Sequence, residues 1–367
     1  MVPPTRNRAH ARARALCEQL GDTPQLFPVL RGVLSYYVMQ GQMQEAHRLG
    51  EQMLRQAQAQ PDPAPRMLAH FQLGLVLFWR CEPAAAQTHH TQALTLYTPQ
   101  AHRALAVRYG VDVGVASHCY LAWELWSLGF PEQALQQSQA ARTLAQEVAH
   151  PYSLATALFW AAVVHQFRRE TPAVYALATA LTTLAAAQGF VLFLAWGTLV
   201  HGWALALQGQ GEQGIAAMRQ GLAAELATGS TLFQPYGLGL LAEAYRDGGH
   251  PDEGLAVLAE ARAVLETTEG RFYAAELSRL QGALLLRQAV PDAPQGEACF
   301  HQALAIARQQ QAKSWELRAA VSLARLWQQQ GKRDEARELL APLYGWFTEG
   351  FDTADLQKAK TLLDALA

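Results

Sequence analysis

Three glycines in this sequence have the spacing of a phosphate-binding loop. Gly209, Gly211 and Gly214 match the GxGxxG pattern of dinucleotide-binding proteins. That loop must follow a β-strand, whereas the residues before Gly209 form an apolar helical pattern. The same turn recurs along the chain with other residues in place of the glycines. We therefore predict a helix end and a turn here, and no cofactor site.

Adjacent histidine and cysteine residues are the next candidates for chemistry. His89 adjoins His90, and His118 adjoins Cys119. Neighbouring side chains on a helix diverge by about 100°, so such a pair cannot chelate one ion well. Ser117 beside His118 has the same flaw as a nucleophile and base, and no nearby Asp is placed to orient the imidazole. We expect no catalytic and no metal-binding residues.

The charge balance limits the classes of partner. Lys plus Arg is 29 against 31 for Asp plus Glu. A chain so close to neutral has no global field to hold a polyanion or an anionic lipid surface. We predict neither a nucleic-acid nor a membrane partner.

Cysteine usage and hydropathy indicate a cytoplasmic protein. Cys17, Cys81, Cys119 and Cys299 lack the paired spacing of a zinc site and lie in helical patterns, as expected of reduced thiols. The stretch 190–207 has no formal charge, but it holds two glycines and no flanking Lys or Arg cluster. We interpret it as a buried helix, and we predict neither a signal peptide nor a membrane span.

The elements that would position any site come from an internal repeat. A small residue recurs five positions after a helix-breaking Gly or polar residue and begins a second helix, at positions 46, 86, 134, 173, 214, 254, 298 and 336. A second small residue often follows seven positions after this one, and a third lies twelve positions before it, in the first helix of the pair. This spacing resembles the tetratricopeptide repeat (TPR), in which small residues mark the close approach of paired helices. The period is about 41 residues, longer than the usual 34 or so.

The repeat predicts an all-α fold, a right-handed α-solenoid of about eight long-period TPR-like helical hairpins with a C-terminal capping helix. We expect an orphan helix of a preceding repeat over 1–22, the superhelix over 23–350 and the cap over 351–367. The capping helix should run from about Ala354 to Leu366, with Asp352 or Thr353 as N-cap. Because the first helix has no partner, we expect that something normally precedes it.

Four segments carry a resemblance to a known family. Residues 13–32, 150–170, 202–224 and 312–363 resemble the C-terminal repeat region of large bacterial signalling ATPases. That group includes maltose-regulator-like transcription activators and proteins that join a class III nucleotide cyclase domain to an AAA-type ATPase. The resemblance implies a sensor arm whose catalytic domains lie upstream. This sequence contains no GxxxxGK[ST] loop and no paired cyclase aspartates, so no catalytic residue of the family carries over.

The inner face of the solenoid is the predicted binding surface. In TPR-like units it is formed by the first helix of each pair, and projecting that rule gives an aromatic middle and a charged C-terminal half. Tryptophans on this face would clamp a peptide or an aromatic ligand, and arginines would recognise a carboxylate or a phosphate group. The alternative is that the aromatic residues form the hydrophobic core, because longer helices need bulkier core residues. The candidate groove residues are Trp123, Trp126, His165, Gln166, Trp196, Trp203, Tyr236, Glu243, Arg246, Arg279 and Arg287, preceded by Phe71, Phe78 and Trp79.

One charged cluster interrupts an apolar region. Arg168, Arg169 and Glu170 follow a first helix, and we interpret them as a solvated helix end whose cations suit the helix dipole. The alternative is a polar contact for a partner or ligand.

These observations favour a non-catalytic scaffold that binds a protein or peptide, including an upstream ATPase or cyclase domain, or senses a small effector. One alternative is a small-ligand sensor that uses the aromatic groove. A less favoured one is an enzyme on α-hairpins, for which His165, Glu243 and Arg246 are the only candidates and belong to different repeats.

Overall fold

Residues 26–367 fold into eight antiparallel helix pairs. The computed structural model describes residues 26–367, of which 81% are helical and none lies in a strand. The expected orphan helix over 1–22 lies outside the described residues. The pairs are α2 (Leu26–Met39) with α3 (Met43–Gln58), α4 (Pro63–Trp79) with α5 (Pro83–Leu96), α8 (Val113–Leu128) with α9 (Pro131–Val148), α10 (Pro151–Phe167) with α11 (Thr171–Gln188), α12 (Val191–Leu207) with α13 (Gly211–Ala227), α14 (Gln234–Asp247) with α15 (Pro251–Thr267), α16 (Ala274–Leu285) with α17 (Ala293–Gln309), and α18 (Lys313–Gln329) with α19 (Arg333–Trp346).

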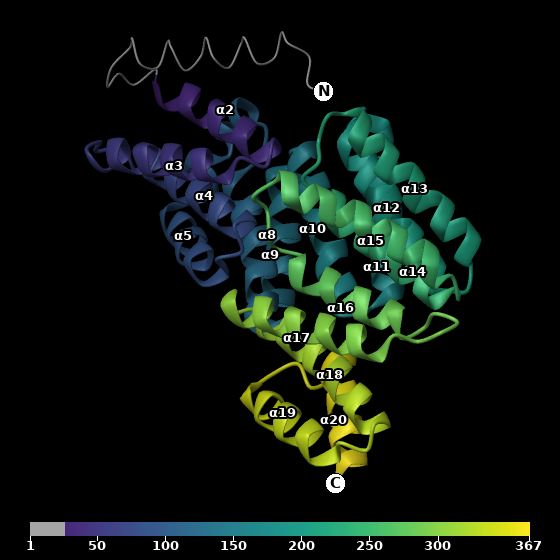
Figure 1. Ribbon diagram of the computed structural model, residues 1–367. Helices are drawn as coiled ribbons and strands as arrows, with labels where there is room; N and C mark the ends of the chain where they lie inside the picture. The colour runs from purple at the N-terminus through teal and green to yellow at the C-terminus, as the bar shows by residue number, and fades with distance from the viewer. Residues whose placement is uncertain (1–25) are drawn as a thin grey trace.

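The predicted all-helical solenoid is confirmed. Two short helices, α6 (Pro99–His102) and α7 (Ala104–Tyr109), occupy the insertion between the second and third pairs. A last helix, α20 (Ala354–Leu366), follows the eighth pair, with Thr353 as its N-cap residue. The Thr353 hydroxyl donates to the Gly350 carbonyl and accepts no hydrogen bond from the backbone N–H groups of α20. Figure 1 shows the pairs stacked in order from purple to yellow.

Small residues hold the paired helices at backbone contact. A Cβ atom on Gly202 of α12 would lie 2.6 Å from the Gly214 carbonyl oxygen, and one on Gly214 would lie 2.5 Å from the Gly202 carbonyl oxygen. Any side chain at either position would force α12 and α13 apart. The small residues of the repeat pattern are therefore required by the close approach of the paired helices.

The predicted register is displaced in two pairs. In α11 the buried positions are Val174 and Leu181, one residue after the small residues chosen from the sequence, and Ala180 is exposed. In α17 the close approach to α16 is made by Gly296, two residues before the predicted Ala298, which is exposed. Alanine is common on both faces of these helices, so the pattern did not distinguish the faces.

The superhelix closes on itself because later segments supply hydrogen bonds to the ends of early helices. The last carbonyls of a helix have no partner within it. Downstream of α2 and α4, the Gly41 and Trp79 carbonyls accept bonds from the Glu269 and Arg271 backbone N–H groups, at 3.0 and 3.1 Å.

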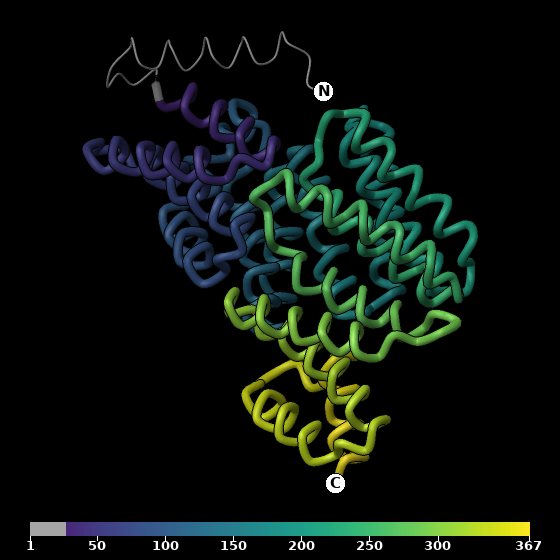
Figure 2. Tube along the Cα trace, viewed as in Figure 1, coloured from purple at the N-terminus to yellow at the C-terminus, as the bar shows by residue number. Residues whose placement is uncertain are grey.

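The next two first helices are capped in the same way by α18. The Trp126 carbonyl of α8 accepts from the Ser314 hydroxyl, and the Phe167 carbonyl of α10 accepts from the Arg318 guanidinium. Residues 151 to 228 positions apart in sequence therefore meet, and Figure 2 shows the later helices lying across the turns of the earlier ones.

The loop between α19 and α20 adds a further contact between the two halves. The Glu349 carboxylate accepts from the backbone N–H groups of Glu132 and Gln133, at 2.8 and 3.0 Å, and so caps the start of α9. Gly350 lies against Pro131 with φ +74°, and a Cβ atom there would lie 2.1 Å from the Pro131 Cγ. Only glycine fits this position.

Among the described helices, none is both long enough and apolar enough to cross a membrane. Gly209 lies in the turn between α12 and α13 with φ +88°, as predicted, whereas Gly211 begins α13 and Gly214 lies within it.

Candidate functional site

The middle of the superhelix is filled by a shared aromatic core. The Trp123 ring lies 4.1 Å from that of Trp160 and 5.6 Å from that of Phe272, centroid to centroid. Trp126 packs on Trp315 of α18 at 4.6 Å. These contacts join helices from opposite ends of the chain, so the same closure that caps the helix ends also brings the inner faces together.

Most of the predicted groove aromatics belong to this core. Trp123, Trp126 and Trp203 are at most 2% exposed and Tyr236 is fully buried. The Tyr236 hydroxyl donates to the side-chain oxygen of Gln166, which is also buried. These residues do face the inside of the superhelix, but the superhelix is closed tightly enough to exclude solvent from them.

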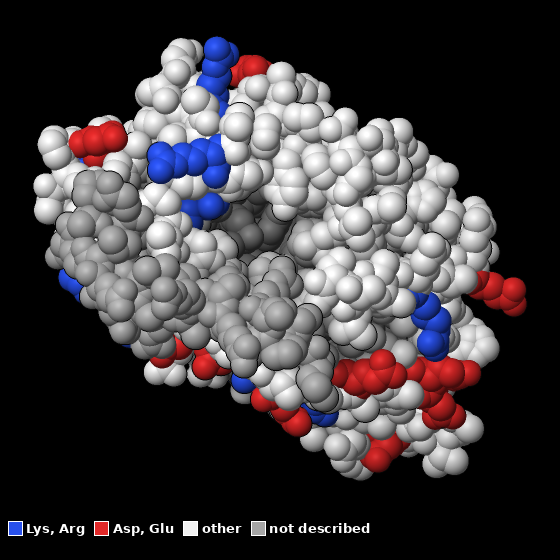
Figure 3. All heavy atoms as spheres, turned by 90° about the horizontal axis from the view of Figure 1, so that it is seen from above, with Lys and Arg blue, Asp and Glu red and all other residues white. Residues whose placement is uncertain are grey.

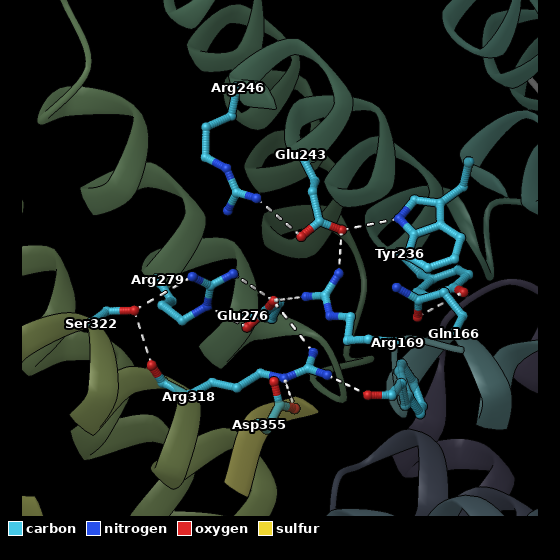
Figure 4. Close-up of polar contacts among 12 residues, drawn as sticks. Gln166, Arg169, Tyr236, Glu243, Arg246, Glu276, Arg279, Arg318, Ser322 and Asp355 are labelled. Atoms are coloured by element: carbon cyan, nitrogen blue, oxygen red, sulfur yellow. Dashed lines mark hydrogen bonds and ion pairs between the residues drawn. The ribbon is translucent and has the colours of Figure 1, made fainter. Parts of the chain in front are cut away.

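Below the aromatic core lies an ionic cluster, made of Arg169, Glu243, Arg246, Glu276, Arg279, Arg318 and Asp355 (Figure 4). Arg169 donates to Glu243 at 2.6 Å, and Glu243 also accepts from Trp203 at 3.0 Å. Arg279 makes two 2.8 Å bonds to Glu276. Arg318 reaches Glu276 at 3.6 Å. The cluster therefore ties α10, α14, α16 and α18 together.

Asp355 extends the cluster to the C-terminal helix. Its carboxylate accepts from Arg318 at 2.7 Å. The Arg318 guanidinium also stacks 5.0 Å from both the Trp126 and Trp315 rings. This one side chain therefore links the ionic cluster, the aromatic core and α20.

Two carboxylates of the cluster, Glu243 and Glu276, stay ionised although they are buried. Burial by itself would raise the pKa of Glu243, but Arg169 and Arg246 outweigh it and hold the pKa well below its ordinary value. Burial opposes ionisation of Glu276 too, and Arg279 followed by Arg318 lowers its pKa to about 2. A buried carboxylate with such a low pKa depends on its cations for stability.

The interpretation of Arg168, Arg169 and Glu170 as a solvated helix end is wrong. The side chains of Arg168 and Arg169 are 4% and 15% exposed. Arg168 donates to Glu170 and to the Pro131 carbonyl, and Arg169 reaches partners 74 and 107 residues away. The cations turn inward because the closed superhelix places carboxylates opposite them.

Arg169 has an unusual backbone conformation. Its φ is +65°, in a turn where Gly41, Gly129, Gly209 and Gly249 follow other first helices with φ between 72° and 97°. A non-glycine residue in the left-handed region costs about 1–2 kcal/mol. The sequence therefore places an arginine where the backbone favours glycine, and the contacts of its side chain account for that choice.

A cavity of about 520 Å³ opens beside the ionic cluster, between α14, α16, α18 and α20; we call it the cationic cavity. The predicted residues Glu243, Arg246, Arg279 and Arg287 all line it. Three further cations that sequence reasoning missed, Arg318, Arg325 and Lys358, also line it, together with Arg169 and the carboxylates Asp247 and Asp355. Arg325 and Lys358 carry no sequence signal, because each is one cation among many on a helix surface.

A second cavity, of about 770 Å³, lies at the opposite end of the aromatic core, near the first turns of α10 and α12; we call it the aromatic cavity. Trp79, Trp160, Trp196 and Phe233 line its wall, and Tyr152 lies at its edge, 38% exposed. Figure 3 looks onto this end of the molecule and shows a hollow with Lys and Arg side chains along one edge and uncharged residues along another.

A buried glutamine, Gln72, lies in the wall of the aromatic cavity. Gln72 is 1% exposed and lines the cavity, and its side-chain oxygen has no hydrogen-bond partner among the residues that the structure describes. A buried acceptor left unpaired costs about 1–3 kcal/mol. Gln72 was not predicted, although an uncharged polar residue within the apolar run of α4 was a usable signal.

His165 lies apart from the predicted residues of the cationic cavity, whereas Arg287 lies at its mouth. The His165 imidazole pairs with the Glu170 carboxylate. Arg287 is 56% exposed and donates to the Arg246 carbonyl at the mouth of the cationic cavity. His165 is not among the residues that line the cationic cavity with Glu243 and Arg246.

No protein-family model matches the sequence, and no curated protein matches it either. Solved structures do. A Rap protein in complex with competence and sporulation factor has a TM-score of 0.63 at 12% identity, over 98% of this chain and 95% of that chain. The Rap conjugation gene regulator of plasmid pLS20 in complex with the Phr* peptide has a TM-score of 0.56 at 12% identity, over 93% and 95%. The fold is a TPR-like α-solenoid. At these identities the likeness concerns the fold.

Two longer proteins are also similar. Yeast Tom70 matches 89% of this chain at 14% identity and a TM-score of 0.45. A signal-transduction ATPase with a tetratricopeptide repeat sensor from Pyrococcus horikoshii matches 99% of it at 12% identity and a TM-score of 0.48. The chain spans 58% and 55% of the lengths of these two proteins.

Proposed function

We propose that the chain is a non-catalytic scaffold that binds a short peptide segment of a partner protein in the aromatic cavity. The observation that carries the proposal is the cavity itself, with a volume of about 770 Å³, an aromatic wall and the unpaired Gln72 oxygen. Apolar side chains of a peptide would fill the aromatic wall, and a peptide N–H would satisfy the Gln72 oxygen. The similar Rap regulator structure was solved with a peptide, which supports this class of ligand.

Two exposed tyrosines provide a matched test. Tyr152 lines the aromatic cavity and Tyr175 lies outside it on α11, and both are 38% exposed. Peptides selected from a random displayed library on the full chain should bind the Tyr152→Ala variant about tenfold or more weakly, and the Tyr175→Ala variant like the wild type. Failure to select any peptide, or equal binding to both variants, would overturn the proposal.

Gln72→Leu separates ligand recognition from folding. Leucine removes the unpaired acceptor at similar size, so the free protein should gain about 1 kcal/mol of stability. The same variant should bind a selected peptide about five- to tenfold more weakly, because one hydrogen bond to the peptide is lost. A variant that gains stability and keeps full affinity would show that the peptide does not use this oxygen.

A small-ligand sensor is the second candidate for the same cavity. Its volume suits a drug-sized molecule as well as a few peptide residues, and most of its lining is apolar. An aromatic small molecule that competes with selected peptides, and loses affinity in Tyr152→Ala, would favour this alternative.

The finer part of the proposal is that the chain acts as the regulatory arm of a signalling ATPase or cyclase-type protein. The four segments that resemble such proteins support it. Hydrogen exchange measured with and without a candidate upstream ATPase domain added in trans tests it. Slower exchange over residues 1–60 on mixing would support the regulatory arm, and unchanged exchange there would count against it.

A further inference from the structure

The cationic cavity holds more positive charge than its own residues neutralise. Seven cations line it, and the carboxylates that line or touch it are Glu243, Asp247, Asp355 and, beneath its floor, Glu276. Seven cations against four carboxylates leave a surplus of three positive charges. The last residues of α12, α14 and α18 also line the cavity. Helix C-termini each carry roughly half a negative charge and the first turn of α20 half a positive one, so a balance of about one to two positive charges remains.

The unneutralised charge lies at the mouth of the cavity. The floor cations Arg169, Arg279 and Arg318 are all paired with cluster carboxylates. Arg325 of α18 and Lys358 of α20 form neither a hydrogen bond nor an ion pair within residues 26–367, and both are exposed. Two free cations on neighbouring helices therefore face one hollow.

These cations are held in a field that opposes their charge. Partial burial, followed by the charge of Arg279, lowers the pKa of Arg325, and Asp355 opposes the effect. Burial also lowers the pKa of Lys358, and Arg169, Arg318 and Arg325 add to the effect while Asp355 opposes it. An anion in the cavity would relieve this repulsion.

We infer that the cationic cavity binds a small organic phosphate and that the ligand fastens α20 to α18. A phosphate monoester carries about −1.5 to −2 at neutral pH, which matches the charge left over. Guanidinium groups recognise phosphate oxygens in pairs. The volume of about 520 Å³ exceeds inorganic phosphate, and Leu286, Phe300 and Val321 supply an apolar wall for the organic part.

Two lysines of α20 provide the matched test. Lys358 lines the cavity, and Lys360, two residues along the same helix, pairs with Asp364 and does not line it. Calorimetric titration of the full chain with ADP, pyrophosphate and adenosine at low salt should show binding of the two phosphate compounds and none of adenosine. Lys358→Gln and Arg325→Gln should each weaken ADP binding about tenfold or more, and Lys360→Gln by less than about twofold.

A second readout tests the fastening of α20. Saturating ADP should slow hydrogen exchange over 354–366 in the wild type and not in Lys358→Gln. Binding that is weakened equally by Lys358→Gln and Lys360→Gln would reveal a non-specific charge effect and overturn the proposal, as would the absence of any heat with ADP and pyrophosphate. Tyr152→Ala should leave ADP binding unchanged, so the failure of this inference and that of the peptide proposal are distinguishable.

Discussion

Replacement of Arg169 by glycine compares the free energy of its backbone strain with that of its ion pairs. The change relieves the left-handed strain of a residue with φ +65°, worth about 1–2 kcal/mol, although glycine also adds about 0.5–1 kcal/mol of unfolded-state entropy. It removes a cation from Glu243 and Glu276, and the loss of one partner from a buried pair costs about 3–5 kcal/mol. Glu243 keeps Arg246 and Trp203, which favours the lower end. We expect a net loss of about 2 kcal/mol.

Gln311→Gly is the control for the backbone. Gln311 has φ +54° two residues after α17, and its side chain is exposed. Both variants share the two backbone effects, so the difference between them reports the ionic contribution, which we expect to be about 3 kcal/mol. Urea unfolding followed by circular dichroism and by tryptophan fluorescence measures it, if the two probes coincide. Equal stability of Arg169→Gly and Gln311→Gly would refute the idea that the side-chain contacts hold this residue in the left-handed region.

Two further predictions concern helix packing and pH. Gly202→Ala should destabilise the chain by about 1–3 kcal/mol, because its Cβ atom meets the backbone of α13. Gly32 lies in the interior of α2 with open space around it, so Gly32→Ala should stabilise the chain by about 0.5–1 kcal/mol. Urea unfolding of both variants measures these changes. Burial raises the pKa of Glu225 from 4.5 to about 7, so the folded state holds this proton more tightly than the unfolded chain. The resulting stabilisation is complete below pH 4.5 and is lost as the pH rises through 7. Between pH 5 and 8 the wild type should therefore lose up to about 3 kcal/mol more than Glu225→Gln, and an equal loss in both would contradict the assignment.

The helix pairs could be predicted because the close approach of two helices requires small residues at regular positions in the sequence. Only small residues fit where α12 and α13 touch, and Gly202, Gly214 and Gly221 recur at fixed spacing for that reason. The register failed in α11, where larger residues such as Val174 and Leu181 fill the interface, and in α17, where Gly296 makes the contact two residues before Ala298. Alanines on the outer face then imitated the pattern.

The closure of the superhelix could not be predicted. It depends on small rotations from each pair to the next, which add up along the array and leave no periodic residue. Backbone bonds such as Arg271 N–H to the Trp79 carbonyl have no side-chain signature. The aromatic and charged residues of the inner face were therefore found, but which of them are core and which line a cavity was decided by that curvature.

Closure also determines how a ligand would act on the chain. The carbonyls of Gly41, Trp79, Trp126 and Phe167 receive their hydrogen bonds from the later half, and opening would leave them to water at a net cost of about 1 kcal/mol each. The buried ion pairs add to that cost. A ligand must prefer one state by about 5.5 kcal/mol to reverse a strongly biased equilibrium. Because the cationic cavity is lined by Arg169, which follows α10, as well as by α18 and α20, an occupant contacts both halves that closure brings together. We therefore expect ligand binding to stabilise the closed superhelix and not to open it.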